Sequence, residues 1–178
     1  MDERRKPRVI VGVSRSLSGL QALRVSVAEA RSTGAQLWAV RSWREPAGWG
    51  RPPIWQFYDE VTQEVTAELR DAFAMAMGGL PADVAVRPLV LAGEPGQTLI
   101  SVADRDNDLI VVGAGTRRGL RRGGRVARYC LRHASCDVLV VPAPRLARLG
   151  RTSTLTRRLS RELSRSTGSR GTVETISP

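Results

Sequence analysis

Short runs of apolar residues alternate with longer segments of helical periodicity along most of this 178-residue chain. The short runs predict buried strands, because residues covered on both faces of a parallel sheet form nearly continuous hydrophobic stretches. We place these strands at residues 8–13, 36–43, 84–91, 108–113 and 138–142.

Between the strands, apolar residues recur every three or four positions, which predicts amphipathic helices. We expect helices at about 19–33, 55–77 and 124–133, and a further one after the sequence Gly-Glu-Pro-Gly at 93–96. Ser18 is the expected N-cap of the first helix, and Gly34 is expected to end it. Strands that alternate with helices indicate an α/β fold, with an open parallel sheet and helices on both faces.

The composition indicates one globular domain with short additions at both ends. Hydrophobic residues make up 42% of the chain, a normal value for a soluble domain. We place a charged lead at 1–7, the domain at 8–144 and a tail at 145–178 that is rich in Arg, Ser, Thr and Gly. Such a tail is expected to be disordered. No apolar run reaches the roughly 20 residues of a membrane span, and no secretory signal is evident, so we expect a cytoplasmic protein.

The net charge of +11 is concentrated in two places. Residues 114–133 hold seven Arg and no acid, and residues 143–178 hold eight Arg and two Glu. Clustered Arg creates a positive potential that favours anionic partners. A nucleic acid or an acidic protein is therefore a candidate partner for the Arg-rich loop and the tail.

Few residues suggest catalytic or metal chemistry. Two cysteines are too few for a disulfide framework, so we expect Cys130 and Cys136 to be reduced and structural. With one histidine, His133, neither a metal site nor a nucleophile–base pair is expected. Three aspartates at 104, 106 and 108 are interpreted as a solvated helix end. Two tryptophans at 49 and 55 could stack on a bound base, although packing is the more frequent role.

One glycine- and arginine-rich segment carries the main binding hypothesis. In an open parallel sheet, ligands bind at the carboxyl ends of the strands where the strand order reverses, here between the first and fourth strands. Residues 12–14 and 113–126 should meet there. Glycines let backbone N–H groups face a ligand, a helix N-terminus attracts anions, and Arg suits phosphate. The segment predicts phosphate binding, with a solvated flexible connection as the alternative.

Several of these segments together resemble the universal stress protein family. The resemblance covers residues 8–142 and is carried by 9–14, the strand end at 39–40, 93–95, and the stretch from 109–113 through 131–141. It implies a Rossmann-like five-stranded parallel sheet of order 3-2-1-4-5. It also implies a homodimer through the edge of the last strand, which needs a partner or protection. The implied function is a non-enzymatic stress-response module with ATP or AMP as candidate cofactor.

The nucleotide pattern of the family is altered in this chain. Members that bind ATP carry Gly-x2-Gly-x9-Gly-Ser/Thr after the fourth strand. Here the pattern begins at Gly113, has Thr116 as its second position, is two residues shorter before Gly124, and ends in Arg125. Ser14 stands where those members carry an Asp that meets the nucleoside. The resulting candidate site residues are Gly12, Val13, Ser14, Val40, Val112, Gly113, Gly115, Thr116, Gly124, Arg125 and Val126.

These departures leave two further functions open. One is a nucleotide-free basic interaction protein that uses the Arg-rich loop and the tail on nucleic acid or an acidic partner. The other is an enzyme such as a slow ATPase, which is the least supported, because the segments that face the cleft offer neither a general base nor a P-loop lysine.

Overall fold

The computed structural model describes residues 6–44, 54–115 and 124–145, and the side chains of the same residues apart from 54–60. The chain divides into two units, Met1–Pro144 and Arg145–Pro178. Of the predicted tail at 145–178, residues 146–178 lie outside the described residues.

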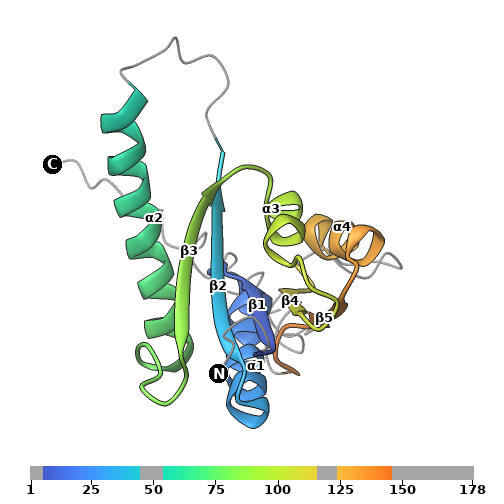
Figure 1. Cartoon of the computed structure of the whole chain (residues 1–178). Coiled ribbons are helices and arrows are strands. Elements are labelled where there is room, and N and C mark those ends of the chain that lie inside the picture. The colour runs from blue at the N-terminus through green and yellow to red at the C-terminus, as the bar shows by residue number, and fades with distance from the viewer. Residues whose placement is uncertain (1–5, 45–53, 116–123, 146–178) are drawn as a thin grey trace, which may run out of the picture. The chain divides into compact units, whose positions relative to one another are not determined.

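Five parallel strands form one sheet in the order β3-β2-β1-β4-β5, which confirms the predicted fold and strand order (Figure 1). In register, Ile10 of β1 lies between Trp38 of β2 and Ile110 of β4. The strand ends differ from the sequence prediction by one or two residues. The bounds are β1 Arg8–Gly12, β2 Gln36–Trp43, β3 Val86–Ala92, β4 Leu109–Gly113 and β5 Asp137–Val141.

Helices cover both faces of this sheet, as predicted. The bounds are α1 Leu17–Thr33, α2 Ile54–Met77, α3 Pro95–Val102 and α4 Arg125–His133. Alternate residues of each strand point to opposite faces, so the sheet supports two cores. Leu23 of α1 and Phe73 of α2 pack with Val11 in the first core. Residues of α3 and α4 pack in the second, where Figure 1 places these two helices side by side.

The start of the first helix corrects one prediction. Ser16, rather than Ser18, caps α1: its backbone is extended, and its hydroxyl accepts a hydrogen bond from the N–H of Gly19 at 3.1 Å. Both serines are good capping residues, so their types could not separate them. The tertiary structure does, because Ser18 is buried and its hydroxyl accepts a hydrogen bond from Gly115. Gly34 ends α1 in a left-handed conformation, as predicted.

The two edges of the sheet differ in chemistry. Edge strand β3 contains Pro88, which has no N–H to offer and suits an edge position. Edge strand β5 pairs with β4 on one side, and Leu139 on it is 39% exposed. A dimer through β5 stays a prediction.

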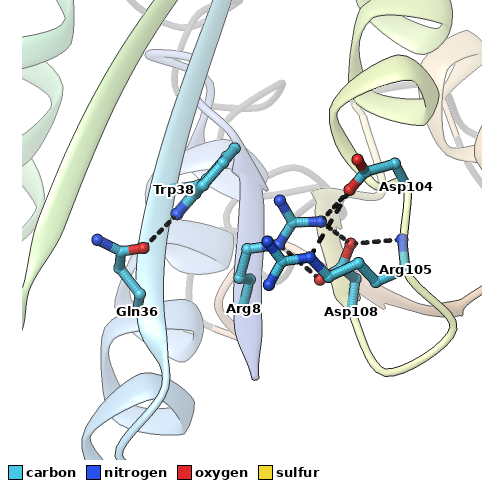
Figure 2. A network of polar contacts seen from close by, with 6 residues as sticks. All are labelled: Arg8, Gln36, Trp38, Asp104, Arg105 and Asp108. Carbon is cyan, nitrogen blue, oxygen red and sulfur yellow. Dashed lines mark hydrogen bonds and ion pairs between the residues drawn. The ribbon is translucent and has the colours of Figure 1, made fainter. Parts of the chain in front are cut away.

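A buried ion pair ties the beginnings of β1 and β4 together. Arg8 donates from Nε to Oδ1 of Asp108 at 2.8 Å and from Nη2 to Oδ2 at 2.5 Å. Figure 2 shows Arg8 between the carboxylates of Asp104 and Asp108 on one side and the ring of Trp38 on the other. The guanidinium carbon of Arg8 lies 4.4 Å from the centroid of that ring. Arg8 also reaches the exposed Asp104. The prediction of a solvated acidic helix end is therefore wrong for Asp108, whose side chain is fully buried.

Candidate functional site

A cleft of about 230 Å³ opens at the carboxyl ends of β1, β2 and β4. This is the edge of the sheet at which the sequence placed a ligand. Ten of the eleven candidate residues line the cleft, and Thr116 lies outside the described residues. The lining residues are Gly12, Val13, Ser14, Ser16, Val40, Arg41, Ser42, Pro95, Leu99, Val112, Gly113, Gly115, Gly124, Arg125 and Val126.

Sheet-like backbone hydrogen bonds continue for one residue beyond the ends of β1 and β4, beside the cleft. The N–H of Val13 donates to the carbonyl of Val40 at 2.8 Å, and the N–H of Ala114 donates to the carbonyl of Val141 at 2.8 Å. Beyond these bonds the chain turns away into α1 and toward α4. The cleft is therefore bounded by rigid backbone on the sheet side.

One wall of the cleft is apolar. Val40 and Val112 are buried at the ends of β2 and β4, and Leu99 of α3 is 2% exposed. Val126 of α4 packs against the same core. Such a wall suits the flat face of an aromatic base or a similar apolar group.

The glycine turn after β4 packs directly on the start of α1. A Cβ on Gly113 would lie 2.7 Å from the carbonyl carbon of Ser18, so a side chain here would displace backbone. Gly115 has a φ of 73°, a conformation that favours glycine, and its N–H donates to the Ser18 hydroxyl at 3.1 Å. Gly115 also lies against Gly124, which brings the two described ends of the glycine-rich segment together.

The N-terminus of α4 opens onto the cleft without a side-chain cap. Gly124 occupies the N-cap position and makes no side-chain hydrogen bond, and the first turn holds no acid. At α1, by contrast, Ser16 satisfies the N–H of Gly19. The first N–H groups of a helix need partners, and together with the helix dipole they attract anions. Arg125 adds a full positive charge at the same place.

Serine hydroxyls connect the cleft to the glycine turn. The Oγ atoms of Ser14 and Ser16 are 3.0 Å apart, and those of Ser16 and Ser18 are 3.4 Å apart. Because a hydroxyl both donates and accepts, Ser14 can present either group to a ligand. The chain of hydroxyls ends at the N–H of Gly115.

Sequence reasoning missed five lining residues: Ser16, Arg41, Ser42, Pro95 and Leu99. Arg41 is the most informative, since its Nη1 donates to the Val13 carbonyl at 3.1 Å and its Nη2 to Glu68 at 2.5 Å. Arg41 and Ser42 could have been found, because they follow the candidate Val40 toward the carboxyl end of the same strand. Pro95 and Leu99 depend on how α3 packs, which the sequence pattern does not give.

Among the described lining residues the charged side chains are Arg41 and Arg125, with no carboxylate. Because Arg41 is paired with Glu68, Arg125 is the lining charge that suits the cleft to an anion. In the described part of the chain, no group of three or more His, Cys, Asp or Glu side chains could hold a metal ion. The side chains of Trp49 and Trp55, which could stack on a base, lie outside what the structure describes.

Cys130 and His133 both lie on α4: Cys130 faces the core and His133 faces solvent. Cys130 is fully buried, and burial raises the pKa of its thiol to about 11. His133 is exposed and lies against the ring of Tyr129, with centroids 4.3 Å apart. Both cysteines are free thiols, as expected.

Comparison with known proteins gives one family and one fold. The model of the Universal stress protein family matches residues 7–142. No curated protein sequence matches the chain. Among solved structures, the universal stress protein UspA from Lactobacillus plantarum has 23% identity and a TM-score of 0.57, over 77% of this chain and 98% of its own.

Two further solved structures are similar. A universal stress protein from Archaeoglobus fulgidus has 23% identity and a TM-score of 0.57, over 76% of this chain and 98% of its own. A universal stress protein solved in complex with cAMP has 23% identity and a TM-score of 0.51, over 78% of this chain and 98% of its own. Among the described residues, no helix is long and apolar enough to cross a membrane.

Proposed function

This chain belongs to the universal stress protein family, and we propose that it is a non-enzymatic stress-response module that binds an adenine nucleotide, ATP or AMP. The proposed site is the cleft between the ends of β1 and β4, with the altered phosphate loop at one side. Binding would change which surface the protein offers to its partners.

The uncapped N-terminus of α4 is the observation that carries this proposal. It combines the N–H groups of a first helical turn that Gly124 does not cap, a helix dipole and Arg125 beside a turn in which Gly113 and Gly115 bring backbone close to α1. Phosphate is the common biological ligand of a helix N-terminus preceded by a glycine turn. Arg125, where related members carry a hydroxyl, supplies a charged donor that strengthens hydrogen bonds to phosphate.

The remainder of the cleft fits a nucleoside. The apolar wall formed by Val40, Leu99 and Val112 offers contact to a base, and Ser14 offers one hydroxyl to a ribose. A volume of about 230 Å³ favours a compact ligand over a dinucleotide. The related universal stress protein solved with cAMP supports the choice of an adenine nucleotide.

The described cleft offers serines and arginines but no carboxylate or histidine in the position of a general base. We therefore propose a binding role rather than hydrolysis. If the purified protein hydrolyses ATP, and the activity is lost in an Arg125→Ala variant, the non-enzymatic part of the proposal is wrong.

The direct test measures nucleotide in the purified protein and then the thermal stability with added ligand. At a ligand concentration 100 times Kd, binding stabilises the folded state by about 2.7 kcal/mol. For a domain of this size each kcal/mol raises Tm by about 3 °C, so AMP should raise Tm by about 8 °C.

Adenosine, which is AMP without its phosphate, is the control ligand that isolates the contact between Arg125 and the phosphate. An Arg125→Ala variant should bind AMP about 10–100 times more weakly, because a hydrogen bond to a charged group contributes about 1.5–3 kcal/mol. The same variant should bind adenosine unchanged. Equal weakening for both ligands would place Arg125 away from the phosphate, and no stabilisation by any adenine nucleotide would exclude the proposed function.

A further inference from the structure

Three arginines follow one line along the side of α4 that faces away from the core, with Arg125 and Arg132 exposed and Arg128 half-buried. Arg125, Arg128 and Arg132 are spaced three and four residues apart, so they lie within about 60° of each other around the helix axis. The buried residues of the same helix, Ala127 and Cys130, lie on the opposite side. We call Arg125, Arg128 and Arg132 the arginine stripe. It extends about 10.5 Å along the axis.

The charges of the arginine stripe have no acidic partner in the described part of the chain, since none of the three forms an ion pair there. Some arginines elsewhere are paired: Arg31 with Asp83, and Arg41 with Glu68. Helix α4 itself contains no Asp or Glu. The stripe therefore presents an uncompensated positive surface, which attracts anionic partners.

An aromatic pair flanks the stripe. The exposed imidazole of His133 lies 4.3 Å from the ring of Tyr129, with an angle of 35° between the planes. The ring of Tyr129 packs closely against Gly96 of α3: a Cβ placed on Gly96 would lie 2.7 Å from the Cδ1 atom of Tyr129. The ring of Tyr129 therefore packs on α3, and the ring of His133, which follows Arg132 in the sequence, lies against it.

We propose that the arginine stripe, together with His133, is a docking surface for single-stranded nucleic acid. Guanidinium groups make forked hydrogen bonds to phosphate oxygens, and an exposed ring beside them can stack on an unpaired base. Single strands expose base faces that a duplex keeps inside its stack. Arg125 also lines the cleft, whereas Arg128 and Arg132 do not, so this surface begins at the proposed nucleotide site and extends beyond it along α4.

An anionic membrane is the main competing partner. Membrane binding requires apolar side chains next to the cations, and Leu131, 58% exposed, lies on the other flank of the stripe. The exposed ring of His133 on the same helix as the cations favours a nucleic acid strand, and the vesicle comparison tests the membrane.

The experiment measures the affinity of the full chain for a labelled 12-nucleotide single-stranded RNA by fluorescence anisotropy, from 50 to 300 mM salt. The stripe variant is Arg128→Gln with Arg132→Gln. The control variant, Arg70→Gln with Arg87→Gln, removes the same charge from exposed positions on α2 and β3. Circular dichroism and Tm establish that both variants are folded.

For single strands, log K changes with log salt by about −0.7 for each phosphate contacted. Loss of two contacts should therefore reduce the steepness of the salt dependence by about 1.4 and weaken binding about 25-fold at 0.1 M salt. The control variant should lose less than twofold. Equal losses in the two variants, or no RNA binding by the wild-type protein at 50 mM salt, would overturn the proposal.

A second comparison tests the role of the ring. A His133→Ala variant should bind the RNA at least about fivefold more weakly, through loss of base stacking, and bind inorganic polyphosphate unchanged. Equal effects on both polymers would overturn the assignment to nucleic acid. So would a stripe variant that loses binding to vesicles containing phosphatidylglycerol while its RNA binding is unchanged.

Discussion

The buried pair of Arg8 and Asp108 predicts a large and strongly non-additive effect on stability. Asp108 accepts two hydrogen bonds from Arg8 and one from the N–H of Arg105 at 3.1 Å. The side chain of Arg8 is 4% exposed and that of Asp108 is 0% exposed. The two acidic neighbours raise the pKa of the Arg8 guanidinium, mainly through its hydrogen bond to Asp108.

Removal of one partner leaves the other as an uncompensated buried charge, which costs about 3–5 kcal/mol. For Asp108→Leu we expect the lower end, about 3 kcal/mol, because Arg8 keeps its contact with the exposed Asp104. For Arg8→Met we expect about 4 kcal/mol, since the remaining carboxylate keeps only backbone donation from Arg105. The double variant removes both charges and should cost about 1 kcal/mol, mostly the cation–π contact with Trp38.

Urea unfolding of the wild-type protein, the two single variants and the double variant measures this coupling as a double-mutant cycle. Independent side chains would give a double variant about 7 kcal/mol less stable than wild type, more than many domains possess. A double variant that loses the sum of the two single losses would contradict the buried ion pair, because the two side chains would then act independently.

Two further predictions concern the thiol on α4 and the turn after β4. Because burial raises the pKa of Cys130 to about 11, only about one thiol in a thousand is ionised at pH 8, so a thiol reagent should label Cys130 only after unfolding. The contribution of the protonated Cys130 thiol to stability is complete below about pH 9 and lost as the pH rises through about 11. Labelling of Cys130 in the folded protein at pH 8, told apart from labelling of the half-buried Cys136 by peptide mapping, would refute the burial. Gly113→Ala should destabilise by about 1–3 kcal/mol, because the new Cβ would overlap the backbone of Ser18. Gly34→Ala is the control, because a Cβ at Gly34 would meet nothing within 4 Å and only the left-handed φ opposes it. It should lower the free energy of unfolding by about 1 kcal/mol. Equal losses for the two variants in urea unfolding would argue against close packing at Gly113.

The location of the candidate site could be predicted because it depends on chain topology. Parallel strands end at one edge of the sheet, so residues after β1, β2 and β4 must gather there once the strand order is known. Gly12, Val40 and Gly113 all follow from that rule. Leu99 and Pro95 do not, because they reach the cleft through the packing of α3, which depends on the shape of the second core.

The serines near the start of α1 show a second limit of sequence reasoning. Ser16 and Ser18 have the same chemistry and lie two residues apart, so a pattern cannot decide which one caps the helix. In the folded chain the glycine turn after β4 reaches Ser18 and takes its hydroxyl, while Ser16 caps α1. A contact between residues 97 positions apart decided the matter.

The sequence by itself determined the five strands, their order through the family resemblance, and the edge of the sheet at which the candidate cleft lies. Those features follow from local periodicity and from the few ways in which parallel strands can be connected. Only the tertiary structure decided that Asp108 is buried rather than solvated and that α4 leaves its N-terminus uncapped at the cleft. Only the fold, likewise, separated paired arginines such as Arg8 from the arginine stripe, which forms no ion pair with the described residues. A charged residue has the same identity in every setting, and its role depends on which distant side chain folding brings beside it.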